Sequence, residues 1–444
     1  MSEACMRPVT RSIDRRGKWL QGLLLALSVA LLLACGKDPE EEAPPRIRDF
    51  RTFGLVTVVV KDDVDDGHVL LCKSAPSDRS TSNIRLLGSD GSLQGDIALG
   101  QLPRRIEDLD FLPEDLLYTD VEPLDDGSLL LAGAGLQSGL DDRLHMVLYR
   151  LTRTGDPVGE PIRRFITEHA AVVTVPPTEP QADPDGLPRH RALIARLNEG
   201  IAVAVRWETQ VTAGIRLWWI PTADMGGAIT STDLPLGPPG DRLLQFAGGP
   251  STGQVVVVVD HATTGGHHQT RVVGFHVDAG AWSAPEECVL PWSDLEPQQL
   301  TFTEGTFLLI GHRPVDGFIR PFISRFQTAA SAADGLFDVS DPVSAGHPLA
   351  AYCAQVINGS IRIAMQEHEA SAAPPWFNGD ITSDLVLAKL DANGNVVDRQ
   401  VIVPGQGLRA IAVSGTEGQT RVIGTMHPYL NAAYEHTFFL VPDQ

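Results

Sequence analysis

Residues that could perform acid–base chemistry, ligate a metal or bind a polar ligand recur at similar places along the chain. In five segments they follow a glycine by six to nine residues, after a short apolar run. Histidine is the commonest metal ligand in proteins and a natural acid or base near neutral pH. These positions could therefore form a metal or catalytic site, form a polar ligand-binding rim, or have no shared role. They are Arg206, Trp207, Glu208, His261, His312, Arg313, Glu367, His368 and His427.

Seven repeated segments must position these side chains. In each, a turn glycine precedes an apolar run, and successive glycines lie between 52 and 73 residues apart. The first six runs are each followed by a second hairpin pattern, and short apolar runs around glycine turns are typical of β-hairpins. Each unit is therefore expected to contain four strands, A to D. The marker glycines are Gly67, Gly127, Gly200, Gly253, Gly305, Gly359 and Gly418.

Seven four-stranded antiparallel units predict an all-β fold, a seven-bladed β-propeller. After its third strand the seventh unit reaches Gln444 without a fourth, so segment Ile47–Phe53 is predicted to supply that outer strand and close the circle. Two β-sandwich domains are the alternative, but they would not explain seven near-equal intervals. Arg104–Leu117 is the best candidate for a short helix. Because strand B lies second from the axis, equivalent histidines of neighbouring blades should be too far apart to share one ion.

The N-terminus contains a targeting signal. A basic region precedes the apolar stretch Leu23–Ala34, which is too short to span a membrane and fits a signal-peptide core. The stretch ends in Leu-Leu-Ala-Cys-Gly at 32–36, which resembles the lipobox of bacterial lipoproteins. That resemblance implies a signal peptide at 1–34 and acylation of Cys35, the only covalent group expected, with no other cofactor. Residues 35–46 are charged and rich in proline, which predicts a flexible tether before a propeller at 47–444.

Two further features refine the family and the location. Gly36 rather than Asp follows the cysteine, which by the same resemblance favours the outer membrane of a Gram-negative bacterium, with the body periplasmic or surface-exposed. Leu385–Ile402 and the turn at 125–131 resemble the delta-60 repeats of bacterial surface and secreted propellers. This second resemblance implies a fold and supplies no shared catalytic residue.

Composition excludes some functions, and several motifs have a plain structural interpretation. The net charge of −21 disfavours nucleic-acid binding, and no P-loop, H-E-x-x-H or CxxC motif occurs. The G-x-S-x-G pattern at 249–253 precedes a β-run, so it predicts a turn between strands A and B. The acidic stretches 62–67 and 391–395 are also expected to be turns, and His267-His268 is expected to be solvated. Trp218-Trp219 should pack within a strand, and Cys72, Cys288 and Cys353 fall in non-adjacent blades, which disfavours a disulfide.

These observations predict a lipid-anchored, monomeric, non-catalytic propeller of the cell envelope. It would contact the membrane through its anchor and bind a protein or glycan partner through the face that carries the B–C and D–A connections, here called the top face. The longest insertions fall on that face, at 101–121, 163–191 and 366–382. One alternative is a periplasmic or surface enzyme, a lyase or hydrolase, that uses His261, His312, His368 and His427. Another is a structural spacer without a ligand site.

Overall fold

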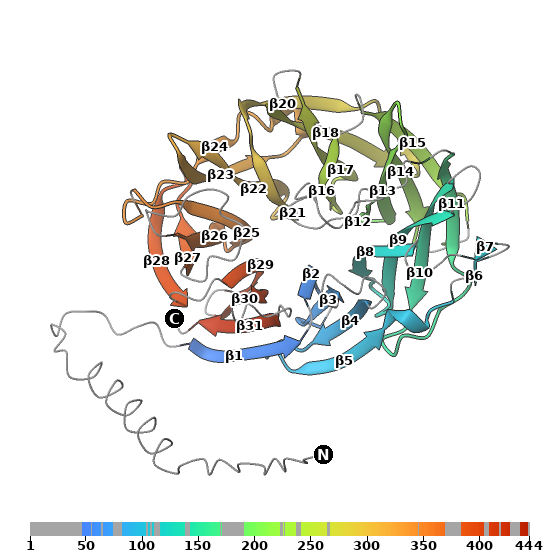
Figure 1. Ribbon diagram of the computed structural model, residues 1–444, viewed down its shortest axis with the longest axis horizontal. Helices are drawn as coiled ribbons and strands as arrows, with labels where there is room; N and C mark the ends of the chain where they lie inside the picture. The colour runs from blue at the N-terminus through green and yellow to red at the C-terminus, as the bar shows by residue number, and fades with distance from the viewer. Residues whose placement is uncertain are drawn as a thin grey trace, which may run out of the picture. The chain divides into compact units, whose positions relative to one another are not determined.

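The repeats form seven small antiparallel sheets arranged in a circle, a seven-bladed β-propeller, as the sequence predicts (Figure 1). The computed structural model describes residues 47–442 except 55, 64, 74–81, 104, 107–108, 111–115, 138–142, 169, 171–190, 223–224, 226, 237–240, 264–266, 345, 369–382, 404–407, 417–418 and 427–435. Cys35, His427 and most of the two insertions at 163–191 and 366–382 lie outside this part.

Each blade runs from an inner strand A to an outer strand D (Figure 1). Blade 1 contains β2 (Val56–Asp62), β3 (His68–Lys73), β4 (Ser82–Leu87) and β5 (Leu93–Ala98); blade 2 contains β8 (Leu116–Pro123), β9 (Leu129–Gln137), β10 (Arg143–Leu151) and β11 (Ile162–Thr167). Blade 3 contains β12 (Ala192–Arg196), β13 (Gly200–Glu208), β14 (Ala213–Pro221) and β15 (Thr230–Pro235). Blade 4 contains β16 (Arg242–Gly249), β17 (Gln254–Ala262), β18 (His268–Asp278), and both β19 (Ala281–Trp282) and β20 (Glu286–Ser293) beside β18.

The remaining blades follow the same order. Blade 5 contains β21 (Glu296–Thr303), β22 (Thr306–Val315), β23 (Phe318–Phe326) and β24 (Leu336–Asp338); blade 6 contains β25 (Leu349–Ile357), β26 (Ser360–Glu367), β27 (Asp384–Leu390) and β28 (Val396–Val403). Blade 7 contains β29 (Leu408–Thr416), β30 (Gln419–Met426), β31 (His436–Pro442) and, as its outer strand, β1 (Ile47–Gly54). β1 pairs antiparallel with β31, from Ile47 opposite Pro442 to Gly54 opposite His436, so the predicted closure is confirmed.

Strand B of each blade is buried on both faces, which explains its continuous apolar runs. In β17, Val255, Val257 and Val259 pack between blades 3 and 4, whereas Val256 and Val258 pack between blades 4 and 5. Successive side chains of a strand point to opposite faces, so one strand serves two interfaces. The marker glycines allow the turn before it: Gly127 and Gly253 have φ of 79° and 67°, a region that other residues avoid.

The inner strands tie neighbouring blades together at a recurrent β-bulge. Blades 1, 2, 4, 5, 6 and 7 each have a register shift near the start of strand A. In blade 2 the bulge turns Thr119 and Asp120 toward blade 3. The Thr119 hydroxyl pairs with the backbone of Ala192, and Asp120 Oδ2 accepts from the Ile194 backbone N–H at 2.7 Å. Bulges of this kind re-aim side chains, here onto the backbone of the next blade.

One structural prediction is wrong and several are confirmed. Arg104–Leu117 is not a helix where it is described: β6 (Arg105–Ile106) pairs with β7 (Leu109–Asp110), and β8 begins at Leu116. The apolar residues of this stretch belong to two short strands rather than to one helical face. Residues 250–253 form the expected turn, Trp218 is buried in β14, and no disulfide joins Cys72, Cys288 or Cys353 among the described residues. Within the described part of the chain, no helix has the length and apolar character needed to cross a bilayer.

Candidate functional site

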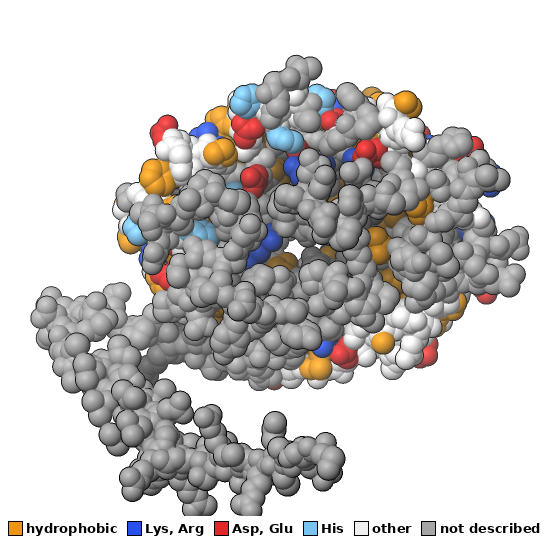
Figure 2. Space-filling model, viewed as in Figure 1, with side chains coloured by type: hydrophobic (Ala, Val, Ile, Leu, Met, Phe, Trp, Pro, Cys, Tyr) orange, Lys and Arg blue, Asp and Glu red, His pale blue; other side chains and the backbone are white. Residues whose placement is uncertain are grey.

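Charged and imidazole side chains line the top face at the strand ends of blades 3 to 6. Figure 2 shows acidic, basic and histidine side chains interspersed there, with histidines gathered over the blade that contains β18 and β20. Most are held in hydrogen-bonded pairs that join strands or blades. We call this set the polar rim: Arg206, Glu208, Asp241, Arg242, Asp260, His261, His267, His268, Asp294, Glu296, His312, Arg313, Asp338, Asp341, His347 and Glu367.

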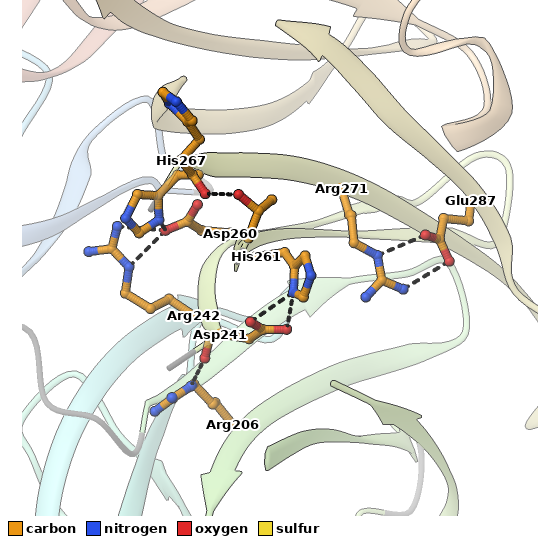
Figure 3. A network of polar contacts seen from close by, with 10 residues as sticks. Arg206, Asp241, Arg242, Asp260, His261, His267, Arg271 and Glu287 are labelled. Carbon is orange, nitrogen blue, oxygen red and sulfur yellow. Dashed lines mark hydrogen bonds and ion pairs between the residues drawn. The ribbon is translucent and has the colours of Figure 1, made fainter. Parts of the chain in front are cut away.

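The most buried part of the polar rim lies between blades 3 and 4 (Figure 3). Arg206, at the end of β13, forms an ion pair with Glu208 and donates from Nε to the Asp241 carbonyl at 2.7 Å. Asp241 immediately precedes β16, and its carboxylate is 2.9 Å from Nδ1 of His261 through both oxygens. Asp241 is almost fully buried, whereas the His261 side chain is 30% exposed. A carboxylate that binds Nδ1 fixes the imidazole so that Nε2 can serve as an acceptor or base.

Arg271, on β18, extends this cluster toward the outer strand of blade 4. It forms a bidentate pair with Glu287, at 2.7 and 2.9 Å (Figure 3). These hydrogen bonds raise the pKa of Arg271 and lower the pKa of Glu287, since each stabilises the charged form of its partner. The charge of Asp241 also raises the pKa of Arg271, so the two acidic groups act on one guanidinium.

The other face of blade 4 carries a second cluster around Asp260, which is buried. Its Oδ2 accepts from Arg242 at 2.7 Å and lies 2.9 Å from Nδ1 of His268, while Oδ1 has no hydrogen-bond partner among the described residues. Asp294 accepts the backbone N–H of His268 and contacts Nδ1 of His267. The side chains of His267 and His268 are 70% and 44% exposed, so both are solvated as predicted, although a buried carboxylate also holds the imidazole of His268.

Blade 5 sends its two candidate residues in opposite directions. His312 is buried, with Nε2 3.0 Å from Glu296 and Nδ1 3.2 Å from the carbonyl of Ala351 in blade 6. Arg313 makes a bidentate pair with Asp338 on the outer strand and lies 3.9 Å above the Trp292 ring. The first residue therefore joins two blades, and the second presents a stacked guanidinium at the outer edge of the top face.

Blade 6 places Glu367 in an ion-pair network rather than in the central channel. Arg399, on β28, contacts both Glu367 and the buried carboxylate of Asp341, and His347 lies 3.7 Å from Glu367. His368 follows the strand, is buried, and donates its backbone N–H to the Pro348 carbonyl. These contacts connect the end of strand B to the loop that enters blade 6.

The structure does not gather the predicted residues that it describes, which exclude His427, into one centre. The reason is whether each residue stands an odd or an even number of positions after its marker glycine. His261 stands eight residues after its marker glycine and His312 seven residues after its own, so the two imidazoles leave strand B on opposite faces. Arg206 and Glu208 likewise point toward blade 4, whereas Trp207 packs toward blade 2. Among the described residues no three His, Cys, Asp or Glu side chains are placed to hold a metal ion.

Sequence reasoning missed the residues that make the polar rim a network. Asp241, Arg242 and Glu296 stand at the start of strand A, and Asp338 and Arg399 on strand D. One signal was available in the sequence: strand A begins with a charged residue in two consecutive blades, Arg242 and Glu296. Because strand A starts on the face where strand B ends, these residues could have been expected near the candidates. No such signal exists for the ion pairs that join strand B to strand D across the strand between them, which are Arg313 with Asp338 and Glu367 with Arg399.

Comparisons with known proteins find likeness in fold alone. No protein-family model and no curated protein matches the sequence. Among solved structures, the polysaccharide lyase Uly1 is similar at 10% identity over 94% of this chain and 95% of its own, with a TM-score of 0.43. A NanB sialidase mutant from Streptococcus pneumoniae aligns at 9% identity over 92% and 70%, TM-score 0.42. An apocarotenoid oxygenase mutant from Synechocystis aligns at 10% identity over 76% and 71%, TM-score 0.41. At these values no activity is assigned to this chain.

Proposed function

We propose that this chain is a lipid-anchored propeller of the bacterial cell envelope that binds a polar partner, a protein or a glycan, through the polar rim. The observation that carries the proposal is the arrangement of partly exposed imidazole and guanidinium groups on the buried carboxylates of Asp241 and Asp260 in blade 4. Side chains held in this way are preorganised, so little conformational entropy is lost when a ligand binds them.

Asp260 supports this proposal because its buried carboxylate holds two exposed side chains of the polar rim in place. Its Oδ2 accepts from Arg242 at 2.7 Å and lies 2.9 Å from Nδ1 of His268. Both of these side chains are about two-fifths exposed, so a ligand can contact them. Polar groups fixed in this way suit a hydroxyl-rich or peptide surface.

The anchor rests on the sequence at 1–46. We propose that residues 1–34 are a signal peptide, that Cys35 is acylated, and that the residues up to 46 are a tether of a delta-60-type lipoprotein at the outer membrane. Two or three acyl chains give stable anchoring, at about 0.8 kcal/mol per buried methylene. Expression of the full chain in a Gram-negative host with radiolabelled palmitate tests this. Label should enter the wild type and be absent from Cys35→Ser.

Site-specific photo-crosslinking in the envelope tests the binding function. A benzophenone amino acid replaces His267, whose side chain is 70% exposed on the polar rim, or Val397, which is 57% exposed at the opposite end of a blade. A protein or glycosidase-sensitive adduct is expected at position 267 and not at 397. Arg242→Ala and Arg313→Ala should reduce its yield at least fivefold, whereas Arg362→Ala, outside the polar rim, should leave it unchanged. Equal adducts at 267 and 397, or yields unaffected by both rim variants, would refute the proposal.

A second function is favoured by one specific observation. Asp241 binds Nδ1 of His261 with both oxygens, and no described group hydrogen-bonds Nε2. An imidazole oriented in this way can act as a general base in a lyase or hydrolase, which typically contributes 10²–10⁴-fold to a rate. Turnover of glycoside, ester or uronate-elimination substrates should then fall by about that factor in His261→Ala and in Asp241→Asn. His347→Ala is the control, and activity that survives His261→Ala would exclude this function.

A further inference from the structure

A second polar site lies on blade 2, outside the polar rim. A shallow pocket of about 280 Å³ opens where the top ends of β9, β10 and β11 meet. It is lined by Gln137, Arg143, His145, Arg163, Phe165 and Glu168. None of these residues is among the nine candidate site residues of the sequence analysis, although Arg163, Phe165 and Glu168 lie in the insertion at 163–191.

The pleat of the sheet brings these side chains to one face. Arg143 and His145 are two residues apart on β10, Arg163 and Phe165 are two residues apart on β11, and side chains at this spacing share a face. His145 stands opposite Phe165 in the register, and their rings meet edge to face at 5.7 Å. The pocket is therefore fixed by strand geometry.

The charge in the pocket favours an anion. Among the described residues that line it, two are arginines and one is a glutamate, in a chain whose net charge is −21. Glu168 is 3.6 Å from Arg143, and both side chains are about half exposed, so this ion pair contributes little and a ligand can replace it. Guanidinium groups bind carboxylates with paired, directional hydrogen bonds.

Phe165 indicates what kind of group should carry the anion in the ligand. Its side chain is 47% exposed, so its ring is available to a ligand in the pocket. An exposed ring beside two cations suits a ligand that carries its anionic group on a flat or ring-shaped apolar body. The volume is at the small end of ligand pockets, which limits the ligand to about one ring.

We propose that this pocket binds a carboxylate carried on a single six-membered ring, either a sugar acid or an aromatic acid. Arg143 and Arg163 would bind the carboxylate, and the ring of the ligand would lie against Phe165. The site goes beyond the function proposed for the polar rim, because the two share no residue.

Ligand-observed NMR on the full chain in a mild detergent tests this. Sodium glucuronate and sodium benzoate are the probes, and methyl glucoside at the same concentration is the neutral comparison. Saturation transfer is expected to at least one of the acids and not to methyl glucoside; the acid that responds identifies whether the ring is a sugar or an aromatic. Arg143→Gln and Phe165→Ala should each weaken that binding about tenfold.

Arg164→Gln is the matched control, because Arg164 lies between the two lining residues of β11 and does not line the pocket. It should leave binding unchanged, as should Arg313→Ala on the polar rim. Since Arg143 and Phe165 are both substantially exposed, their replacement should not unfold the blade, and thermal melting verifies this. Equal response to methyl glucoside, no response to either acid, or binding that survives both pocket variants would overturn the proposal.

Discussion

Two interfaces between blades of this molecule have the same architecture but differ in the residues that fill them. The interface between blades 3 and 4 joins consecutive repeats, and a large apolar cluster fills it from Leu193 to Val277. The interface between blades 7 and 1 closes the circle, and its cluster of described residues is small: Leu70, Cys72, Leu87, Ile423 and Phe439. Phe439 is the largest side chain of this described cluster, and the pairing of β1 with β31 completes blade 7.

The polar groups of these two interfaces differ as well. Over blades 3 and 4, Arg206, Asp241 and His261 form a charged layer that reaches the solvent at the top face. Between blades 7 and 1, at the opposite end of the strands, a buried hydrogen bond joins His68 Nε2 and the Ser414 hydroxyl at 3.3 Å. Among the described residues, apolar packing is therefore common to both interfaces, and the buried charged layer belongs to the one that we associate with binding.

The largest effect should come from the closing interface. Phe439→Ala removes a fully buried ring that packs against Leu70 and beside the His68 imidazole. A cavity of this size costs about 3–5 kcal/mol in the free energy of unfolding. Urea unfolding of the full chain measures it, with the exposed Val397→Ala expected to stay within about 0.5 kcal/mol. A loss below about 1 kcal/mol would mean that β1 alone holds the closure.

The charged layer over blades 3 and 4 should have the next largest effect. Asp241→Asn preserves shape but removes the charge that His261 and Arg271 face. Hydrogen bonds to charged groups contribute about 1.5–3 kcal/mol, so we expect a loss near the lower bound in urea unfolding. The double variant with Phe439→Ala should be additive within about 0.5 kcal/mol, because the two sites share no partner. A larger coupling would contradict the view that these interfaces are independent.

The blade architecture could be predicted from the sequence because it rests on local signals. Marker glycines such as Gly127 and Gly253 occupy turns that require positive φ, and a run such as Val255–Val259 must be buried on both sides. The missing last strand of blade 7 left only residues 47–53 to complete it. Each of these signals depends only on residues close together in the chain or on the number of strands, so each can be recognised without a structure.

The polar rim could be predicted only in part, because its partners are distant in sequence. His261 was recognisable at the end of strand B, but Asp241, which positions it, lies 20 residues earlier in another connection. The face on which each residue stands depends on one-residue differences in spacing, which separated His261 from His312 and Trp207 from Arg206. A repeat pattern that tolerates such differences cannot specify which side chains meet.

Ser414→Ala tests the closing interface at a finer scale. It removes one neutral hydrogen bond to His68, so we expect a loss of about 1 kcal/mol in urea unfolding. Thr119→Ala is the matched comparison between blades 2 and 3, where one hydroxyl makes two backbone hydrogen bonds, at 2.6 and 2.9 Å. It should cost more than Ser414→Ala. The reverse order would show that the bond at the closure carries more of the stability than its geometry indicates.

The smallest effect concerns acid sensitivity at the outer part of the polar rim. The backbone N–H of His268 holds the pKa of Asp294 below its usual 3.8, with His267 adding to the effect. A carboxyl whose pKa is lowered by folding stabilises the protein above its ordinary pKa, and this contribution disappears as the pH falls through the folded value. Because the side chain is one-third exposed, we expect about 0.5 kcal/mol at pH 7. Asp294→Asn should therefore be less stable than the wild type at pH 7 and nearly equal to it at pH 2.5, by urea unfolding. A difference that persists at pH 2.5 would show that the asparagine disturbs packing instead, and that the charge of Asp294 does not stabilise this region.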